Sequence, residues 1–418
     1  MTVKNNIHPK NSYYSRYLHG FLNFLVPLGK KTAYISVTPH VEKLSGMYDY
    51  AVISDALGYE NDVEVFLKDI RTHIEPDGRI IITQYNALWE PVARLASLLG
   101  LKSMKPQNWL SMIDLKNFAH LAGFEVLKSG SKMLMPVYIP LVSWFCNIII
   151  VNIFPFSKLG AFHYIVARPI VSSAKSLSNP SVSIIVPARN ESGTVEKIIA
   201  ELPELGSFTE IIFIEGHSKD DTLQAIQKGV GAYKGTKRLS YAVQDGKGKG
   251  DAVRKGFAMA TGDILMIYDA DMTVPASEVH KFYDAIAHNR GDFINGSRLV
   301  YPLEKESMRT LNFFGNKFFS FAFSTILGQT LKDTLCGTKV LWKEDYEFIQ
   351  SNRAFFGDFD PFGDFDLLFG AAKLNLKIID MPIHYRERIY GDTNIKRWSH
   401  GWLLLKMTVF ATRKIKFI

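Results

Sequence analysis

The sequence predicts an α/β protein of two domains, with a mostly parallel sheet in the second. With 418 residues, the chain is long enough for two domains of ordinary size. Strand and helix patterns alternate in both halves, as they do where crossover helices cover a parallel sheet. Residues 171–180 are small, polar and without periodicity, which is typical of a linker. We therefore place the domains at residues 1–170 and 181–418.

In the first domain the alternation begins late. We expect a strand at residues 48–54, a helix at residues 62–74 and, after a turn at Pro76, Asp77 and Gly78, a strand at residues 79–83. Two more strands are expected at residues 124–127 and 162–167. The apolar residues of the expected helix are Val63, Val65, Phe66 and Ile70.

Residues 133–156 carry no charged side chain. Their number permits one crossing of a bilayer, but Pro136, Pro140 and Pro155 argue against one straight helix. Three interpretations remain open: a segment lying in the membrane interface, a buried hairpin and a true span. We prefer the interface because Lys132 and Lys158 flank the segment as interfacial anchors would.

The second domain opens with four strand signals, at residues 181–186, 210–214, 238–243 and the apolar run that ends at Asp269. Ser192 is expected to cap the first helix. The apolar face of this helix comprises Val195, Ile198, Ile199 and Leu202, the second helix spans residues 220–230, and the third contains Ala252, Val253, Phe257 and Ala260.

Asp269 and Asp271 follow the apolar run, one residue apart. Ligands of parallel sheets bind just beyond the carboxyl ends of the strands. Two neighbouring acids there cannot both ionise cheaply without a cation, and a divalent ion shared with a substrate diphosphate would satisfy them. The sequence therefore predicts that Asp269 and Asp271 bind Mg²⁺ or Mn²⁺, although a turn rich in Asp gives the same pattern.

Other polar motifs follow strands or open helices. Pro187, Arg189 and Glu191 follow the first strand, and Glu215 follows the second. Lys249 lies in a Gly-Lys loop that can approach a phosphate, and Arg298 and Arg388 offer guanidinium groups. Asp364 and Asp366 open an apolar helix, where acids also favour a helix N-terminus electrostatically. Each motif alone is compatible with a solvated surface, but those that follow strands would meet at one edge of one sheet.

The composition of the chain narrows the classes of molecule that the protein is expected to bind. The net charge of +8 favours an anionic partner, and no nucleic-acid-binding signature accompanies it. Cys146 and Cys336 provide neither a disulfide framework nor a zinc spacing, which fits a reducing cytosol. Residues 1–10 are polar and contain no signal-peptide core.

Residues 181 to about 395 resemble an inverting family-2 glycosyltransferase of the GT-A fold, which is Rossmann-like. The closest likeness is to synthases of dolichyl- or polyprenyl-phosphate sugars. The resemblance rests on the order of Pro-x-x-Asn-Glu, acid-x-x-Ser-x-Asp, Gly-Lys-Gly-x-Ala, Asp-Ala-Asp, Gly-Ser-Arg, Asp-Thr-x-x-Gly and Arg-x-Tyr-Gly. With the residue arguments, it implies a nucleotide-sugar site of Pro187, Arg189, Glu191, Ile214, Glu215, Lys249, Asp269, Ala270, Arg298 and Arg388.

Some positions depart from the family pattern. Glu215-Gly216-His217-Ser218 stands where Asp-Asp-Gly-Ser is common, so Glu215 is the substitute for a base-contacting acid. Thr273 and Asn394 replace a frequent Gln and a frequent Lys. From the sequence we expect no pair of transmembrane helices after the catalytic domain, unlike in several relatives.

The resemblance implies transfer of a hexose from a nucleotide diphosphate sugar to a polyprenyl phosphate, with inversion. An acceptor phosphate is already anionic and needs no general base. Two alternatives remain: transfer to a hydroxyl of a soluble or glycolipid acceptor, with Asp364 or Asp366 as the base, and nucleotide-sugar binding without turnover. Residues 402–417, apolar and then basic, support a peripheral or monotopic place at the cytosolic membrane face.

Residues 48–168 resemble the second half of a class I methyltransferase that binds S-adenosylmethionine. The likeness lies in the strand at residues 48–55 and in residues 75–83. A Gly-x-Gly loop after a first strand is missing, because only Gly29 and Gly46 occur between Val26 and Tyr48. We therefore expect a degenerate remnant that does not bind S-adenosylmethionine and acts as scaffold, oligomer contact or membrane attachment.

Overall fold

The computed structural model describes residues 12–36, 44–100, 107–171, 179–301, 310–353, 365–388, 390 and 397–417. The chain divides into two compact units, and each is considered by itself. Unit 1 comprises residues 1–172 together with residues 413–418, and unit 2 comprises residues 173–412. Most of the expected linker, residues 172–178, lies outside the described residues.

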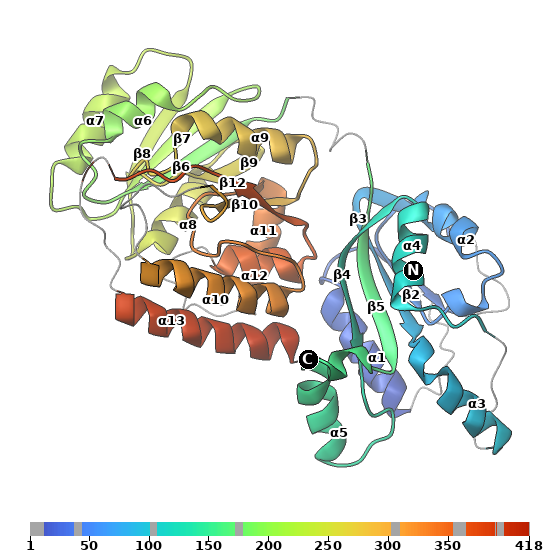
Figure 1. The fold of residues 1–418 in the computed structure, drawn as a ribbon. Coiled ribbons are helices and arrows are strands. Elements are labelled where there is room, and N and C mark those ends of the chain that lie inside the picture. Colours follow the sequence, from blue (N-terminus) through green and yellow to red (C-terminus); the bar gives the residue numbers. More distant parts are fainter. Residues whose placement is uncertain are drawn as a thin grey trace. The chain divides into compact units, whose positions relative to one another are not determined.

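Unit 1 contains a five-stranded mixed sheet (Figure 1). The strand order is β1-β2-β3-β5-β4, with β1 to β3 parallel and β5 antiparallel to both of its neighbours. The strands are β1 Thr32–Ser36, β2 Tyr48–Ser54, β3 Ile74–Tyr85, β4 Phe124–Lys132 and β5 Phe162–Pro169. The main helices are α1 Tyr13–Leu25, α2 Val63–Arg71, α3 Glu90–Leu98 and α4 Met112–Leu121.

Both faces of this sheet are covered, because alternate residues of its strands point to opposite sides. Ile53 packs with buried side chains of α2 and α4, whereas its neighbour Val52 packs with those of α1. The expected strands at residues 48–54, 79–83, 124–127 and 162–167 are confirmed, while α1 and β1 were not predicted. The helix expected at residues 62–74 ends at Arg71. Val65, which was predicted on its apolar face, is exposed to solvent, and Leu67 is buried in the core.

The uncharged stretch forms short helical pieces and no long helix. They are α5 Val142–Trp144, a π-helical turn Phe145–Ile149 and two 3₁₀ turns, Ile150–Asn152 and Phe156–Lys158. Within the described residues, no helix has the length and apolar character needed to span a bilayer. This stretch leaves the sheet at the edge where β3 ends, because Phe162 pairs with both Tyr85 and Lys132.

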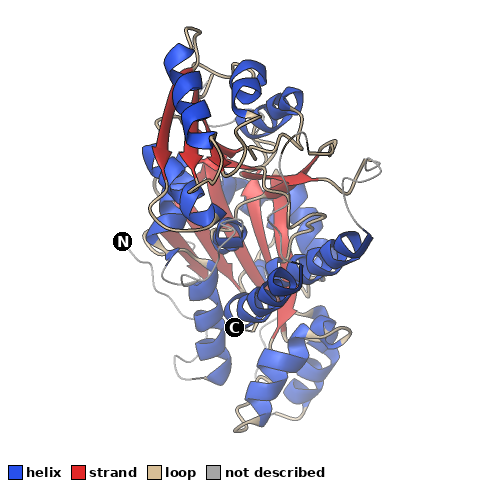
Figure 2. Ribbon diagram, turned by 90° about the vertical axis from the view of Figure 1, so that its left-hand side faces the viewer, coloured by secondary structure: helices blue, strands red, loops and turns tan. Residues whose placement is uncertain are grey.

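Unit 2 contains a seven-stranded mixed sheet flanked by helices (Figures 1 and 2). The order is β12-β10-β11-β9-β6-β7-β8, and β11 alone runs antiparallel to its neighbours β9 and β10. The strands are β6 Val182–Ala188, β7 Thr209–Glu215, β8 Arg238–Val243, β9 Ile264–Ile267, β10 Phe293–Ser297, β11 Lys339–Trp342 and β12 Ile378–Pro382. The helices are α6 Val195–Glu201, α7 Thr222–Ala232, α8 Lys249–Met259, α9 Val279–Ala287, α10 Thr310–Leu327, α11 Lys343–Ser351, α12 Phe365–Lys373 and α13 Arg397–Ala411.

The expected order of strands and helices from β6 to β9 is confirmed, and β11 was not predicted. One expectation about a helix start was wrong. Ser192 does not cap α6, which begins at Val195 after a turn in which the Thr194 hydroxyl donates to the Glu191 carbonyl. The Ser192 hydroxyl instead donates to the hydroxyl of Tyr390, at 3.0 Å.

Helix α13 divides its apolar residues between two environments. Leu404, Met407 and Ala411 are buried, and the helix packs against α10. Trp402 and Val409 are exposed on it. A truncation after Gly401 would therefore remove part of the core of unit 2 as well as the basic residues that follow.

Candidate active site

The paired acids lie directly after β9, at the carboxyl edge of the parallel strands of unit 2. Lys249, the first residue of α8, places its Nζ atom 2.5 Å from Oδ1 of Asp269. The Gly246–Gly250 loop makes this contact possible, because Gly248 adopts the left-handed value φ 89° just before the helix starts. The predicted phosphate-binding lysine therefore neutralises an acid of the pair.

Asp271 is held by a second cation. Arg388 places its Nη2 atom 2.8 Å from Oδ2 of Asp271 and its Nη1 atom 3.0 Å from Oε1 of Glu191. Thr273 donates from its hydroxyl to Oδ1 of Asp271 at 2.9 Å. Arg388 thus bridges an acid that follows β9 and an acid that follows β6, and the structure brings three predicted site residues into one chain of contacts.

The two acids of the pair have opposite electrostatic environments. Burial raises the pKa of Asp271, and the neighbouring Asp269 raises it further against the opposing effect of Arg388. For Asp269 burial acts in the same direction, but the Lys249 ammonium outweighs it and lowers the pKa. Burial also raises the pKa of Glu191 to about 7, with Arg388 opposing and Asp271 adding to the shift. The site is therefore short of positive charge for its three carboxyl groups.

The donor atoms fit a divalent cation that is shared with a substrate. No described group of three or more His, Cys, Asp and Glu residues could hold a metal by itself. Asp269 and Asp271 supply carboxylate oxygens, the ligands that Mg²⁺ and Mn²⁺ prefer, and Mg²⁺ commonly takes its remaining ligands from water and substrate phosphates. Oε2 of Glu191 is buried without a hydrogen-bond partner in the same cluster, so the site has unused acceptor capacity.

Arg298 was predicted to contact a phosphate, and the structure pairs it with a buried acid. Its Nε and Nη2 atoms lie 2.7 and 2.9 Å from the two carboxylate oxygens of Asp333, which is fully buried. Burial would raise the pKa of Asp333, but Arg298 outweighs it and lowers the pKa to about 2. Asn316 donates to the same carboxylate at 2.7 Å. Two of the three guanidinium nitrogens of Arg298 are therefore engaged in an ion pair with Asp333 inside the protein.

Sequence reasoning missed the loop from Asp333 to Thr338. The Nζ atom of the buried Lys339 donates to the carbonyl of Cys336 at 2.5 Å and to Oδ1 of Asn295 at 3.2 Å. The loop lies so close to the pair Asp269 and Lys249 that a Cβ atom on Gly337 would overlap both side chains. Because β11 is antiparallel, the loop before it reaches the edge where its parallel neighbours end. The Asp-Thr-x-x-Gly motif was the available signal.

The remaining nucleotide residues sit at the adjoining ends of β6 and β7, where Ala188 pairs with Glu215. Pro187 is half-buried and Arg189 is exposed, so both are accessible to a ligand. Ile214 and Ala270 are buried. The carboxylate of Glu215 is also buried, and its Oε1 accepts a hydrogen bond from the backbone amide of Ser218 at 2.6 Å, which ties it to its own turn.

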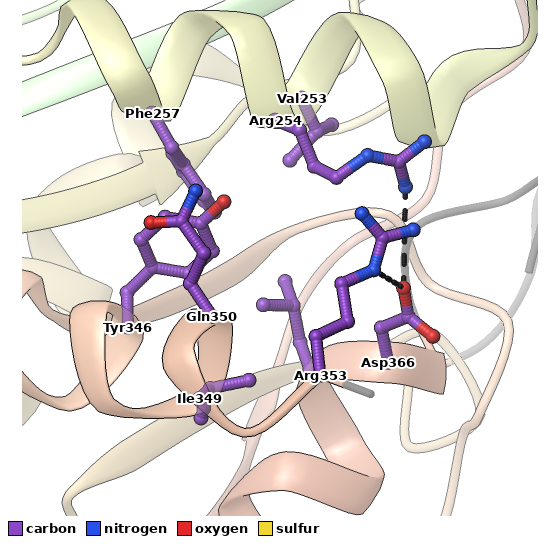
Figure 3. Close-up of a pocket in the computed structure, with 9 residues that line it drawn as sticks. Val253, Arg254, Phe257, Tyr346, Ile349, Gln350, Arg353 and Asp366 are labelled. Atoms are coloured by element: carbon purple, nitrogen blue, oxygen red, sulfur yellow. Dashed lines mark ion pairs between the residues drawn. The ribbon is translucent and has the colours of Figure 1, made fainter. Parts of the chain in front are cut away.

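Of the two candidate bases, Asp364 and Asp366, the structure describes one. Asp364 lies outside the described residues. Asp366 points toward two arginines, with Oδ2 3.3 Å from Nε of Arg353 and 3.9 Å from Nη1 of Arg254 (Figure 3). These residues line a pocket of about 30 Å³ together with apolar side chains such as Phe257 and Tyr346. The carboxylate of Asp366 is therefore engaged in two ion pairs.

Residues 183–349 match the family Glycosyl transferase family 2. This part of the chain is therefore similar to family-2 glycosyltransferase domains. The matched region has an α/β fold with a mixed sheet, and the matches support a nucleotide-sugar glycosyltransferase.

Among curated proteins, the glycosyltransferase AglJ of Haloferax volcanii is 28% identical over 227 residues, which cover 54% of this chain and 69% of AglJ. The dolichyl-phosphate hexose transferase of the same organism is 25% identical over 233 residues, covering 54% of this chain and 92% of that protein. Across the first four curated relatives, the match spans 36% to 92% of the relative's length.

Among solved structures, glucosyl-3-phosphoglycerate synthase of Mycobacterium tuberculosis, in complex with Mn²⁺, uridine diphosphate and glucosyl-3-phosphoglycerate, matches with a TM-score of 0.41. It is 18% identical, and the match covers 57% of this chain and 81% of that one.

Proposed function

We propose that this glycosyltransferase moves a hexose from a nucleotide diphosphate sugar to a polyprenyl (dolichyl-type) phosphate, with inversion, at the cytosolic membrane face. One observation carries the donor half: Asp269 and Asp271 are each held by a cation at the edge where β9 ends. The acceptor half is supported by relatives whose names state transfer to dolichyl phosphate.

Donor binding would use the two ion pairs of the site. Mg²⁺ or Mn²⁺ held by Asp269 and Asp271 would neutralise charge on the diphosphate. Lys249 and Arg388, which contact these acids in the structure, would then turn toward phosphate oxygens. Pro187 and Arg189, at the end of β6, are placed to contact the nucleoside.

Chemistry at the sugar then needs no proton acceptor. An oxygen of the acceptor phosphate attacks the anomeric carbon from the face opposite the diphosphate. The bond from that carbon to the phosphate forms as its bond to the diphosphate breaks, and nucleoside diphosphate leaves with the electron pair. Positive groups beside the leaving diphosphate, Arg388 among them, stabilise the charge that develops there. The ion pairs of Asp366 suit this scheme, since no base is required.

For unit 1 we propose a remnant of a class I methyltransferase that no longer binds the cofactor. Three parallel strands, of which β2 and β3 are joined through α2, support an origin in a doubly wound fold. A peripheral or monotopic membrane position is proposed for the whole chain, supported by the uncharged residues 133–156 and the cations Arg413 and Lys414. Such a membrane position is compatible with a homo-oligomer.

The function can be tested with the purified full chain in mild detergent. Candidate nucleotide sugars are supplied with and without a polyprenyl phosphate, and release of nucleoside diphosphate and formation of lipid-linked sugar are measured. We expect one donor to give release that depends on both acceptor and metal. Transfer to a hydroxyl acceptor with none to the lipid phosphate would refute the proposed acceptor, and nucleotide-sugar binding without any release would refute the enzyme.

A further inference from the structure

Helix α3 of unit 1 has no buried residue, although one of its faces is apolar. Leu88, Val92, Leu95 and Leu99 recur at the spacing of one helical face, and all four side chains are exposed. Leu98 beside them is 85% exposed. A soluble surface helix normally buries such a face, so α3 is a helix whose apolar face lacks a partner within the described residues of unit 1.

A second apolar surface lies on residues 137–159. Val137, Tyr138, Trp144, Phe154 and Phe156 are all exposed. Leu141 is 82% exposed and adopts the left-handed value φ 62°, which is costly for a leucine. Strained backbone that presents a large apolar side chain to solvent is expected where the side chain has a partner outside the chain.

These exposed side chains belong to an ordered segment. The side-chain amide of Asn147 donates to the hydroxyl of Tyr13 at 3.1 Å and to the carbonyl of Met135 at 2.9 Å, and its oxygen accepts from the amide of Met135 at 2.8 Å. The hydroxyl of Ser143 donates to the carbonyl of Val137 at 2.8 Å. The polar side chains of Ser143 and Asn147 therefore turn inward and satisfy the backbone, while many of the large apolar side chains of the segment are exposed.

The two surfaces adjoin. Nε1 of Trp89, just before α3, donates to the carbonyl of Leu159 at 2.8 Å. Asn86 donates to the carbonyls of Lys158 and Gly160 at 3.0 and 2.8 Å. Both elements leave the sheet at the edge where β3 ends, and Figure 1 draws α3 and α5 at the same end of unit 1. We call the exposed apolar side chains of α3 and residues 137–159 the docking face.

Cations lie beside the part of this face that residues 137–159 form. Lys158 is exposed, with its Nζ atom 5.4 Å from the ring centre of Phe154. The Nζ atom of Lys132 donates to Oδ1 of Asn152 and to the carbonyl of Lys416, both at 3.1 Å, which holds the C-terminal segment beside residues 137–159. That segment exposes Arg413 and Lys414. Residues 133–161 contain no acid, and Glu90 of α3 is paired with Arg94.

We propose that the docking face is a membrane-binding surface of unit 1, with α3 and residues 137–159 inserted side by side into the interface of an anionic bilayer. Apolar and aromatic side chains with lysine and arginine beside them match the two layers of such an interface. The inference deepens the proposed function, since it assigns unit 1 the task of bringing the enzyme to a lipid acceptor, and it rests on that function only for its purpose.

The test compares three variants of the full chain for sedimentation with vesicles of phosphatidylcholine and phosphatidylglycerol. The docking variants are Leu95→Gln with Leu98→Gln, and Leu141→Asn, which replaces an exposed apolar side chain with a polar one. The control is Leu28→Gln. Leu28 is 82% exposed in unit 1, but it precedes β1 and so lies at the opposite edge of the sheet. The vesicles contain neither polyprenyl phosphate nor nucleotide sugar, so binding is measured independently of transfer.

We expect the α3 variant to lower vesicle partitioning about tenfold or more, at low and at high salt, because burial of leucine side chains is not screened. Leu141→Asn is expected to lower it without reducing the free energy of unfolding, and Leu28→Gln to leave it unchanged. Transfer to a short water-soluble phosphate acceptor should be equal in all variants, which separates this inference from the proposed function. The inference is overturned if wild type stays in the supernatant, if the α3 variant sediments like wild type, or if sedimentation velocity without lipid shows a dimer that this variant dissociates.

Discussion

Arg388 contacts Asp271 and Glu191 with different nitrogens of one guanidinium group, so the protonation and the ligand state of these two acids are coupled. A substitution at any of the three changes the charge that the other two experience. Predictions about single residues of this site therefore need control variants that remove a charge of the same sign elsewhere.

The first prediction concerns Asp271. Asp271→Asn removes one of the two carboxylates proposed to hold the metal, and we expect transfer to fall by three orders of magnitude or more, about 4 kcal/mol of transition-state stabilisation. Far-ultraviolet circular dichroism should be unchanged. Glu347→Gln, an exposed charge on α11, is the control and should keep full activity. Near wild-type transfer by Asp271→Asn, or by wild type in excess chelator, would contradict the metal role.

A second prediction concerns the pH dependence of stability. The folded-state pKa of Glu191, about 7, lies above its ordinary value of 4.5 because of burial, so the folded protein keeps a proton that the unfolded chain releases. The free energy of unfolding should therefore fall as pH rises from about 4.5 to 7, by on the order of 3 kcal/mol from this group. Glu191→Gln imitates the protonated form and should lose this fall.

Urea unfolding of both proteins at pH 5 and pH 8, without metal, provides the comparison. The stability of Glu191→Gln relative to wild type should be higher at pH 8 than at pH 5. An equal pH dependence in the two proteins would show that Glu191 titrates normally.

The third prediction separates a structural arginine from a ligand-binding one. Asp333→Ala leaves the Arg298 guanidinium buried without its acid, and we expect the free energy of unfolding to drop by about 3–5 kcal/mol. Glu196→Ala breaks an exposed pair with Lys228, at 3.3 Å, and should cost about 1 kcal/mol or less. Chemical denaturation measures both, and equal effects would contradict the structural role of Asp333.

At the scale of single residues, the sequence predicted which residues form the candidate site better than it predicted the contacts between them. Asp269, Asp271, Lys249, Arg388 and Glu191 were all chosen, because they follow strands or open a helix at one edge. Their pairing was not predictable, since it depends on where β12 returns beside β10 and delivers Arg388 to the site. Arg298 shows the limit most clearly, because its acid, Asp333, is supplied by a segment that precedes a strand.

At the scale of elements, the antiparallel strand β11 explains how a loop that precedes a strand joins a site made by loops that follow strands. Gly337 lies in this loop, against Asp269 and Lys249. We predict that Gly337→Ala weakens donor binding tenfold or more, because the added Cβ atom displaces one of the two side chains. Gly231→Ala in α7, where a Cβ atom meets nothing within 4 Å, should leave donor binding unchanged and raise stability slightly.

Calorimetric titration with the donor decides between the two glycine variants. Wild-type affinity in Gly337→Ala would show that the loop yields without disturbing the paired acids.

The bounds of β2 and β8 equal those expected from the sequence. The missed strands β1 and β11 have five and four residues. Such short runs resemble buried helix segments or loops in sequence, and what makes them strands is pairing with β2, β9 and β10. The turn expected at Pro76–Gly78 lies within β3, as an irregularity of that strand. Tyr48 of β2 pairs with Ile74, and Tyr50, two residues later, pairs with Arg79, five residues later, so the register shifts at this turn.

At the scale of the whole molecule, the fifth prediction concerns the ancestry proposed for unit 1. We expect no binding of S-adenosylmethionine by calorimetric titration of the full chain, because no Gly-x-Gly loop follows the first strand of the expected remnant. Micromolar affinity would contradict the remnant and would make unit 1 a second catalytic unit. The titration needs no knowledge of the sugar donor, so its outcome is independent of the proposed transfer.

Residues 413–418 belong to unit 1, so the chain returns to unit 1 after it has formed unit 2. The backbone passes between the units twice, once near residue 172 and again near residue 412, so unit 2 is an insertion within the sequence of unit 1. A protease that cuts residues 172–178 would leave two fragments, of which the larger still ends in a segment held by Lys132. The fragments should therefore co-purify after a single cut. An affinity tag fused to the C-terminus would report on the folding of unit 1 as much as on that of the unit that precedes it.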